Sequence, residues 1–250
     1  MKAVVLCAGL GTRLGHLTKD NPKPMLKVGD NPILVHILGL LKHYGFNQVA
    51  LNLHYKADKI IEFFGNGSSF GISLNYSLEE KPLGTAGALR PLYSWLSGEE
   101  NFLVFYGDIV TDQDLSLIVA KHRQNNAFAT LLVHQRAVSN SAVGVDFQGR
   151  VNLFVERPDE RQQALLRLRN PRPQWVNSGI QILSIKALDA IIKSHATDLP
   201  KDIYMPLHCE MPIYTVPLTG RRYAVDSPQR LESADKAVKS GSVKTYKMIE

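Results

Sequence analysis

Apolar runs alternate with amphipathic segments through the first half of the chain. The runs are four to eight residues long and end at polar or glycine-rich stretches, which is typical of strands, and the longer segments between them have helical spacing. Strands that alternate with helices form right-handed crossovers, so the pattern predicts a mostly parallel sheet. Strands are expected at 2–7, 47–53, 71–77 and 101–108, and helices at 30–45, 56–65 and 85–96.

The first helical segment has its own start and stop signals. Asp30 or Asn31 is expected to be the N-cap, and Pro32 is expected in the first turn. Gly45 stands where a glycine usually follows the last turn of a helix.

After residue 127 the pattern changes to strands joined by tight turns. Strands are expected at 128–135, within 143–156, and at 175–184, 211–218 and 221–226, followed by a helix that begins at Ser227-Pro228. This part predicts a mixed or antiparallel extension of the sheet. The whole pattern predicts an α/β, Rossmann-like, three-layer α/β/α fold with a mixed, mostly parallel sheet.

Composition and charge limit the class of protein. The 250 residues are 44% hydrophobic and 21% charged, as in ordinary soluble globular proteins, and no apolar run reaches the length of a membrane span, so a cytoplasmic protein is expected. The two cysteines, Cys7 and Cys209, have no metal-binding spacing and argue against a disulfide scaffold. A net charge of +6 indicates anionic partners. Nucleic acid is one candidate, but the basic residues are dispersed and no RNA-binding motif accompanies them.

A glycine loop with three cations follows the first predicted strand, in the stretch LCAGLGTRLGHLTKDNPKPM (6–25). Ligands of open α/β sheets bind at this end of the strands, so the loop is a candidate phosphate site. A dinucleotide-binding fingerprint requires glycine where Leu14 stands, and a Walker A loop requires a GK[ST] tripeptide that the chain lacks. With both of these phosphate-binding motifs excluded, the loop is expected to be a phosphate-binding loop of a third kind.

The segment GLGTRL (9–14) with KPM (23–25) closely resembles the signature of the sugar nucleotidyltransferases, which join a nucleoside triphosphate to a sugar 1-phosphate. The resemblance continues in order along nearly the whole chain, and it implies the nucleotide-diphospho-sugar transferase type of fold. The further segments that match are EEKPLGTAGAL (79–89), YGDIV (106–110), FVERP (154–158), VNSGI (176–180) and RRYAVDSPQRL (221–231).

The resemblance implies a role for each matched residue. Arg13, Lys23 and Asp108 would be catalytic, and Asp108 and Asp226 would hold Mg²⁺. Nucleotide binding is implied for Ala8, Gly9, Gly11, Thr12, Glu79, Gly84 and Thr85. Binding of the sugar phosphate is implied for Gly87, Glu156, Arg157, Asn177 and Gly179.

The chemistry of this reaction explains those residue types. The attacking group is already an anionic phosphate oxygen, so catalysis needs positioning and charge stabilisation at the α-phosphorus and no general base. Glycines let backbone N–H groups reach phosphates, and a guanidinium or ammonium offsets their charge. Mg²⁺ takes few protein carboxylates and leaves its other positions to water and phosphate. Each aspartate has a simpler alternative, which is to cap a following helix.

The base and the sugar are specified only in part. A carboxylate at Glu79 matches the paired N–H donors of guanine, and the segment around Glu79 and Glu80 resembles mannose 1-phosphate guanylyltransferases more than thymidylyl or cytidylyl enzymes. Both glutamates have the alternative of being exposed loop residues. GTP with a mannose- or heptose-type 1-phosphate is therefore expected, with UTP or another triphosphate and a different sugar as the alternative. Arg157 replaces the family's usual lysine, and it is expected either to accommodate a different sugar or to pair with Glu160.

One catalytic domain is expected over residues 1–240, with a nucleotide-binding half at 1–127, a sugar-binding half at 128–240 and a C-terminal tail at 241–250. Hexapeptide repeats of the kind that follow this domain in many relatives are absent, so a catalytic domain alone is expected. Small-molecule substrates and a possible homodimer are predicted, with no nucleic-acid or membrane partner. A non-catalytic domain that senses nucleotide sugars is the competing class.

Overall fold

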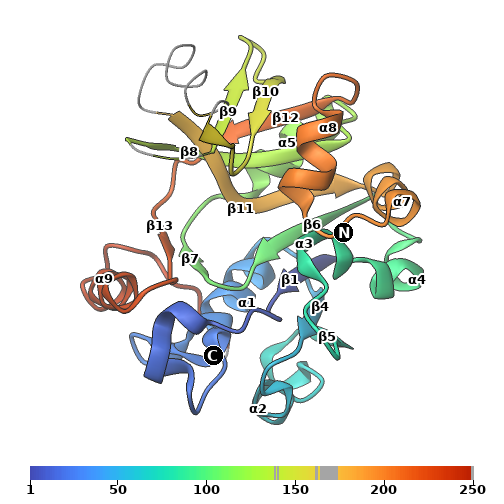
Figure 1. The fold of residues 1–250 in the computed structure, drawn as a ribbon. Helices are drawn as coiled ribbons and strands as arrows, with labels where there is room; N and C mark the ends of the chain where they lie inside the picture. Colours follow the sequence, from blue (N-terminus) through green and yellow to red (C-terminus); the bar gives the residue numbers. More distant parts are fainter. Residues whose placement is uncertain (138, 140, 161–162, 164–173, 249–250) are drawn as a thin grey trace. The chain divides into compact units, whose positions relative to one another are not determined.

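The computed structural model describes residues 1–137, 139, 141–160, 163 and 174–248 (Figure 1). The chain forms two compact units, each made of separate stretches of sequence. Unit 1 comprises Met1–Pro82, Leu103–Asp114 and Thr219–Glu250, and unit 2 comprises Leu83–Phe102 and Leu115–Leu218.

Unit 1 is built on parallel strands in the order β6-β1-β4-β5. Ala3, Val4 and Val5 of β1 are completely buried, as expected for a central parallel strand covered on both faces. The connections run through helices in the alternating manner that the sequence predicts. The main elements are β1 (Ala3–Leu6), α1 (Ile33–His43), β4 (Gln48–Leu53), α2 (Ala57–Phe64), β5 (Ser73–Leu78) and β6 (Asn101–Tyr106), whose first two residues belong to unit 2.

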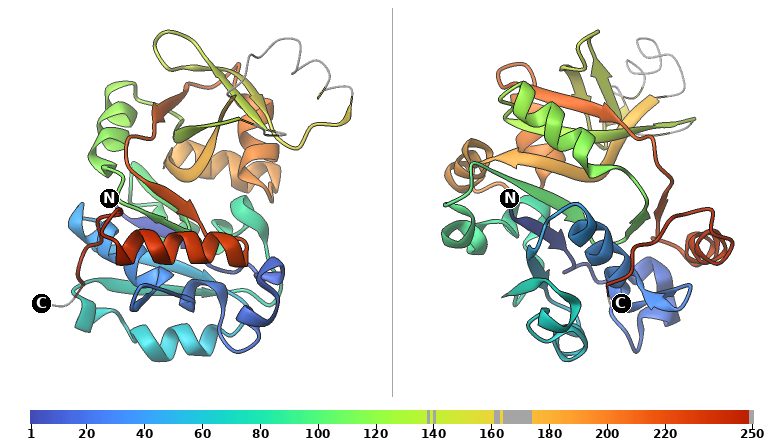
Figure 2. Two further views of the ribbon diagram at one scale, coloured as in Figure 1. Left: turned by 90° about the vertical axis from the view of Figure 1, so that its left-hand side faces the viewer. Right: turned by 180° about the vertical axis from the view of Figure 1, so that it is seen from behind.

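Smaller elements complete unit 1. The antiparallel pairs are β2 (Lys27–Val28) with β3 (Asn31–Pro32), and β7 (Ile109–Thr111) with β13 (Arg222–Ala224). Short 3₁₀ segments cover Thr12–Thr18, Lys23–Met25 and Ser68–Phe70. Helix α9 (Pro228–Lys239) lies beside the β2–β3 pair, where the Asp235 carboxylate accepts a hydrogen bond from the Gly29 N–H at 2.8 Å (Figure 2, left).

Unit 2 contains a mixed sheet. Strand β8 (Ala129–Arg136) pairs antiparallel with β11 (Gln174–Ser184) and parallel with β12 (Ile213–Pro217), and β9 (Ala142–Val145) pairs antiparallel with β10 (Val151–Val155). Its helical segments are α3 (Gly84–Gly87), a 3₁₀ turn (Arg90–Leu92), α4 (Tyr93–Leu96), α5 (Leu115–Gln124), α7 (Ile185–Ser194), a π-helical segment (Leu199–Tyr204) and α8 (Met205–Leu207).

The prediction of an α/β, Rossmann-like fold with a mixed, mostly parallel sheet is confirmed. Two local predictions are wrong. Helix α1 begins at Ile33 and its N-cap is Pro32, because Asn31 pairs with β2 and Asp30 lies in the turn between β2 and β3, so neither expected residue reaches the cap position. The single helix expected at 85–96 is three short pieces, since Pro91 cannot donate the backbone hydrogen bond that a continuous helix needs.

Gly45 follows α1 with a φ of 80°, and Ser227 caps α9 through its hydroxyl, both as predicted. None of the helices in the described ranges is both long and apolar enough to cross a membrane. The predicted binding halves and the 1–240 domain stay predictions.

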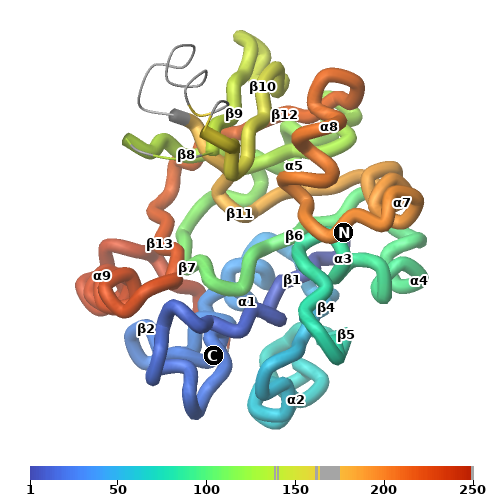
Figure 3. Tube along the Cα trace, viewed as in Figure 1, coloured from blue at the N-terminus to red at the C-terminus, as the bar shows by residue number. Residues whose placement is uncertain are grey.

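The C-terminal tail packs against α1 (Figure 3). The backbone carbonyl of Tyr246 lies where a side chain at Gly39 would be, so this glycine inside a buried helix makes room for the tail. The Lys42 ammonium donates to the Met248 carbonyl at 3.1 Å, and the Lys244 N–H donates to the Asp112 carboxylate at 3.1 Å.

A buried glutamine joins the two stretches that lead into and out of unit 2. The Gln113 side chain is completely buried, and its Oε1 accepts hydrogen bonds from the Thr219 N–H at 2.8 Å and the Gly220 N–H at 2.9 Å. A Cβ at Gly220 would lie 2.8 Å from Gln113 backbone atoms, so glycine is required for this close approach.

Candidate active site

The glycine loop follows β1 and is closed by one threonine. Gly11 has a φ of 67°, and a Cβ there would lie 2.9 Å from the Thr18 methyl group, so this position requires glycine. The Thr18 hydroxyl lies within hydrogen-bond distance of the carbonyls of Gly11 and Gly15, at 3.3 and 3.1 Å. A Cβ at Gly9 would meet nothing within 4 Å, so the loop has an open face at Gly9, next to the buried Ala8 and on the same loop as the exposed Thr12.

The short β7–β13 ladder brings the two predicted metal ligands to the same place. Ile109 pairs with Ala224 in this antiparallel ladder, and the Val225 N–H donates to the Asp108 carbonyl at 2.8 Å. Asp108 precedes one strand and Asp226 follows the other, so both carboxylates lie at the same end of the ladder.

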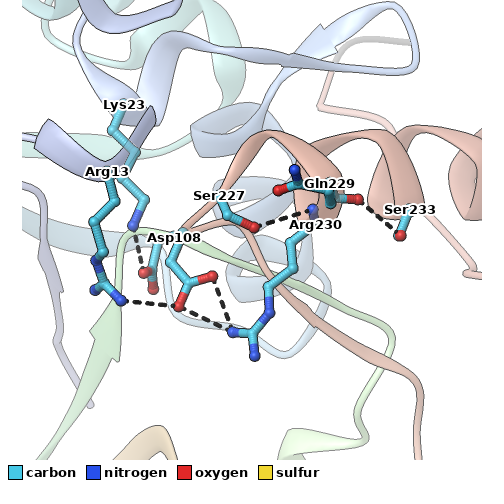
Figure 4. Close-up of polar contacts among 8 residues, drawn as sticks. Arg13, Lys23, Asp108, Ser227, Gln229, Arg230 and Ser233 are labelled. Atoms are coloured by element: carbon cyan, nitrogen blue, oxygen red, sulfur yellow. Dashed lines mark hydrogen bonds and ion pairs between the residues drawn. The ribbon is translucent and has the colours of Figure 1, made fainter. Parts of the chain in front are cut away.

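Three cations contact these carboxylates (Figure 4). Lys23 Nζ lies 2.6 Å from Asp108 Oδ2, and the two side chains are only 14% and 27% exposed. Arg13 Nη1 lies 3.4 Å from Asp226 Oδ2, and Arg230 Nη1 lies 2.9 Å from both oxygens of the same carboxylate. Asp108 is therefore paired with one cation and Asp226 with two.

The alternative that these aspartates are helix caps is wrong. Asp108 is followed by strand β7, and the N-cap of α9 is Ser227, whose hydroxyl accepts a hydrogen bond from the Arg230 N–H at 3.4 Å. The two carboxylates are thus held by side-chain ion pairs and not by helix capping, so a chemical role for them is consistent with the structure.

Close backbone packing places Asp108 next to the start of the glycine loop. The Gly107 N–H donates to the Leu6 carbonyl at 2.9 Å, and a Cβ at Gly107 would lie 2.6 Å from that oxygen. Burial, and then the charge of Asp108, raise the pKa of the Cys7 thiol, so it stays protonated and serves as an inert packing group.

Glu79 is tied to the glycine loop through Asn52. The Asn52 Oδ1 accepts from the Cys7 N–H at 2.8 Å, while its Nδ2 donates to Glu79 Oε1 at 2.8 Å. The Glu79 side chain is buried, so the alternative of an exposed loop residue is wrong for Glu79, whereas Glu80 is exposed. This hydrogen-bonded chain fixes the Glu79 carboxylate relative to the loop backbone.

In unit 2, the segment at 84–87 is organised around the carbonyl of Thr197. That carbonyl accepts from the N–H groups of Ala86 at 2.9 Å and Gly87 at 3.4 Å, and it occupies the space that a side chain at Gly84 would need. The Thr85 hydroxyl accepts from the Leu199 N–H at 2.8 Å. These hydrogen bonds therefore fix the conformation of the loop that carries Gly84, Thr85 and Gly87, the residues implied to contact the substrate.

Strand β11 is irregular where Asn177 and Gly179 lie. The pairing with β8 shifts between Asn177 and Gln181, and Gly179 has a φ of 79°. The Gly179 N–H donates to Asn177 Oδ1 at 3.0 Å. Because Oδ1 is used in this turn, the amide group of Asn177 presents a fixed NH₂ donor.

Arg157 is held by acidic side chains of unit 2. Its Nε lies 3.4 Å from Glu156 Oε1, and its Nη2 lies 3.7 Å from Asp198 Oδ2. Within the described part of the chain, the ion-pair partners of Arg157 are thus Glu156 and Asp198, in place of the expected Glu160. Arg157 remains 63% exposed, so its guanidinium is accessible to a ligand.

The carboxylates of Asp108 and Asp226 suit a hard cation. Among the described residues, no three His, Cys, Asp or Glu side chains are grouped so that they could hold a metal by themselves. Two carboxylates fit Mg²⁺, which binds proteins through one or two carboxylates and takes phosphate oxygens as further ligands.

A family model described as "Nucleotidyl transferase" matches residues 2–205. The chain belongs to the nucleotidyl transferase family. The glycine loop, Lys23, Asp108 and the unit 2 loops all lie within the matched range, whereas Asp226 and Arg230 lie beyond it.

Curated relatives of this nucleotidyl transferase differ in substrate. It is 33% identical to a UTP–glucose-1-phosphate uridylyltransferase of Synechocystis, over 86% of this chain and 58% of that protein. It is 37% identical to a D-glycero-alpha-D-manno-heptose 1-phosphate guanylyltransferase of Campylobacter jejuni, over 74% of this chain and 76% of that one. A Bacillus anthracis protein crystallised with sucrose has the same fold, with a TM-score of 0.82 at 20% identity over 99% and 98% of the chains.

Two residues of the candidate site, Asn52 and Arg230, were not predicted from the sequence. Asn52 had a signal, because it is a polar residue inside a buried strand and must find hydrogen-bond partners. Arg230 had a weaker signal, its position four residues after Asp226 at the start of a helix.

Proposed function

We propose that the chain transfers a nucleotidyl group from a nucleoside triphosphate to a sugar 1-phosphate, releasing pyrophosphate. The observation that carries this proposal is the pair Asp108 and Asp226 at one end of the β7–β13 ladder, each held by cations. In the same unit, a glycine loop with an open backbone face follows β1. Carboxylates for a metal, cations for phosphates and accessible backbone N–H groups are what this reaction requires.

The proposed roles follow from charge and position. Arg13, 77% exposed and bound to Asp226 only at 3.4 Å, is free to move its planar fork to the triphosphate, where it would stabilise the charge that develops at the α-phosphorus. Lys23 would act on the phosphates as a point charge, and the backbone N–H groups at Gly9 and Gly11 would orient them. Mg²⁺ held by Asp108 and Asp226 would supply further charge neutralisation at the phosphate oxygens. The nucleophile is the phosphate oxygen of the sugar 1-phosphate, so no protein base is assigned.

Glu79 supports GTP as the triphosphate. A carboxylate held in place by Asn52 presents acceptors only, and guanine offers adjacent N–H donors on its Watson–Crick edge. The Campylobacter relative is named a guanylyltransferase, and the Synechocystis relative is named a uridylyltransferase. UTP is therefore the second candidate.

A mannose- or heptose-type 1-phosphate is proposed for the residues of unit 2. Glu156, the Asn177 amide and the backbone at Gly179 are suited to sugar hydroxyls, and Arg157 is suited to the phosphate. The 37% identical relative is named for a manno-configured heptose 1-phosphate, which supports this choice. The second candidate sugar is glucose, after the name of the Synechocystis relative.

Pyrophosphate release with Mg²⁺ tests the proposal, with each of GTP, UTP, CTP, dTTP and ATP paired with mannose, glucose, N-acetylglucosamine and heptose 1-phosphates. Release with GTP and a manno-configured sugar is expected, and release only with UTP and glucose would replace the substrate assignment. D226N is the matched test variant, because Asn keeps the shape of the side chain and removes its charge, and it should lose Mg²⁺-dependent release. Nucleotide binding without release in any pair would favour a nucleotide-sugar sensor over an enzyme.

A further inference from the structure

A cavity lies in unit 1 between the end of α1 and the C-terminal tail. Its volume is about 640 Å³, within the range of small-molecule sites. The side chains that matter for its chemistry come from three segments and are Lys42, His43, Ser68, Ser69, Tyr246 and Lys247.

The charge of this cavity has one sign. Two lysines and a histidine line it, and among the residues that the structure describes, none of the lining side chains is acidic. Cations in the last turn of a helix, such as Lys42 and His43, are common because they oppose the helix dipole. The helix dipole does not explain Lys247, because this residue belongs to the tail. It adds positive charge to the same cavity.

The Lys42 ammonium is hydrogen-bonded to the tail and lies close to Gly71. It donates to the Met248 carbonyl at 3.1 Å, and a Cβ at Gly71 would lie 2.7 Å from Nζ. An ammonium has three N–H donors, and the Met248 carbonyl accepts one of them. The others are suited to an anionic ligand.

The aromatic side chains of the cavity are already packed. The ring of His43 stacks on that of Tyr246 with centroids 4.2 Å apart, and the Lys244 ammonium lies 5.0 Å from the Tyr246 centroid. These contacts occupy the Tyr246 ring, so the features offered to a ligand are charge and hydroxyl groups. Ammonium and serine hydroxyl groups together suit the several oxygens of a phosphate.

We propose that this cavity binds the phosphate group of a small phosphate monoester. It is separate from the candidate active site within unit 1. Lys42 and His43 precede β4 and residues 68–71 precede β5, so the cavity lies at the amino end of the parallel strands, whereas the glycine loop follows the carboxyl end of β1. The inference does not rest on the proposed function.

Backbone amide NMR shifts of the full chain test this site directly. Inorganic phosphate, mannose 6-phosphate and GMP are titrated separately without Mg²⁺, and the amides of Ser68, Ser69 and Gly71 report the cavity. Amides of Gly9 and Gly11 report the glycine loop in the same spectra. Saturating shifts at the cavity amides are expected, and the probe that binds most tightly identifies whether the source is free phosphate, a sugar phosphate or a nucleotide.

Two variants and one control separate a site from general charge attraction. K247Q should weaken binding at the cavity amides at least threefold, and K42Q should weaken it about tenfold, with the Tyr246 resonances reporting whether the tail stays docked. K27Q removes an exposed lysine elsewhere in unit 1 and should leave the affinity unchanged. Cavity shifts that never saturate with any probe, or that K27Q reduces as much as K247Q, would overturn the proposal. R13Q should alter only the chemical shifts of the glycine loop, so the proposed phosphate cavity and the proposed nucleotide site are tested independently.

Discussion

Lys23 and Asp108 form an ion pair of 2.6 Å in which the lysine side chain is only 14% exposed. The two residues are 85 positions apart in sequence, and their contact joins the end of the glycine loop to the start of β7. A charge that is mostly removed from water needs a partner of opposite charge, so each of the two side chains holds the other in place.

The first prediction concerns Asp108. D108N should lower Mg²⁺-dependent pyrophosphate release about 10²- to 10³-fold, the scale typical of losing one group that stabilises transition-state charge. It should also lower the melting temperature, because Lys23 loses its counter-charge. E62Q, which changes an exposed carboxylate on α2, is the control. Near-normal turnover in both D108N and D226N would contradict the metal assignment.

The second prediction separates catalysis from stability at Arg13. This side chain is 77% exposed and its ion pair with Asp226 is long, so R13Q should change the free energy of unfolding by less than about 1 kcal/mol. Its effect on kcat/KM should nevertheless be about 10²-fold or more. Chemical denaturation and steady-state kinetics on the same preparation measure both quantities, and a large stability loss with little change in kcat/KM would reverse the assignment.

The third prediction concerns the hydrogen bonds of Asn52. N52A removes the partner of both the Cys7 N–H and Glu79, and unsatisfied buried groups cost about 1–3 kcal/mol each, so stability should fall clearly. Because Glu79 then loses the hydrogen bond from Asn52, KM for the triphosphate should rise more than kcat falls. N47A alters an exposed asparagine just before β4 and should be neutral. An unchanged KM would argue against Glu79 as a base-contacting residue.

The fourth prediction concerns Gly39 and the tail. Alanine in a helix is favoured over glycine by about 1 kcal/mol, but a Cβ at this position meets the Tyr246 carbonyl, and overpacking costs about 1–3 kcal/mol. G39A should therefore destabilise the full chain and stabilise a chain that ends at Val243. G98A, at an open exposed glycine, should have little effect in either background. The same sign of the G39A effect in both chains would show that the tail does not pack there.

The fifth prediction concerns pH. His122 is 1% exposed, and burial, with a smaller contribution from Arg123, lowers its pKa to about 4. Its neutral ring lies 2.8 Å from Asn101 Oδ1 and 3.0 Å from the Thr130 hydroxyl. Below pH 6.5 the unfolded chain binds a proton at this residue that the folded chain does not bind, so stability is lost as pH falls from 6.5 towards 4.

This loss should be about 2 kcal/mol between pH 7 and pH 5. The H122Q variant should be less stable at pH 7 and should vary less with pH over that interval. H16Q changes an exposed histidine and should keep the full pH dependence. Denaturant unfolding at both pH values measures the difference, and equal slopes for H122Q and the unmodified chain would exclude His122 as the source.

The strands were predictable because burial on both faces forces continuous apolar runs, as at Ala3–Leu6 and Asn101–Tyr106. Helix boundaries were harder to predict from the sequence, because they depend on residues that contact the helix from outside it. The pairing of Asn31 and Pro32 with β2 decided the start of α1, and no local signal reveals that pairing.

The candidate site was likewise predictable from the sequence only in part. The glycine loop and the aspartates could be singled out by their resemblance to a family. The meeting of Asp108 with Asp226 could not be derived from local sequence, because it depends on a three-residue ladder between segments that are distant along the chain. Arg230 and Asn52 gain their importance only from the contacts that this folding creates.

The buried Gln113 has a consequence for how such a protein can diversify. Its side chain fixes the points where the chain departs at Asp114 and returns at Thr219, next to the ladder that carries the aspartates. Because the closure free energy of a flexible loop grows only slowly with its length, the surface loops between those points can lengthen at modest thermodynamic cost. The surface loops of the stretch from Leu115 to Leu218, which carries Glu156, Arg157 and Asn177, can therefore vary while the two carboxylates stay in register.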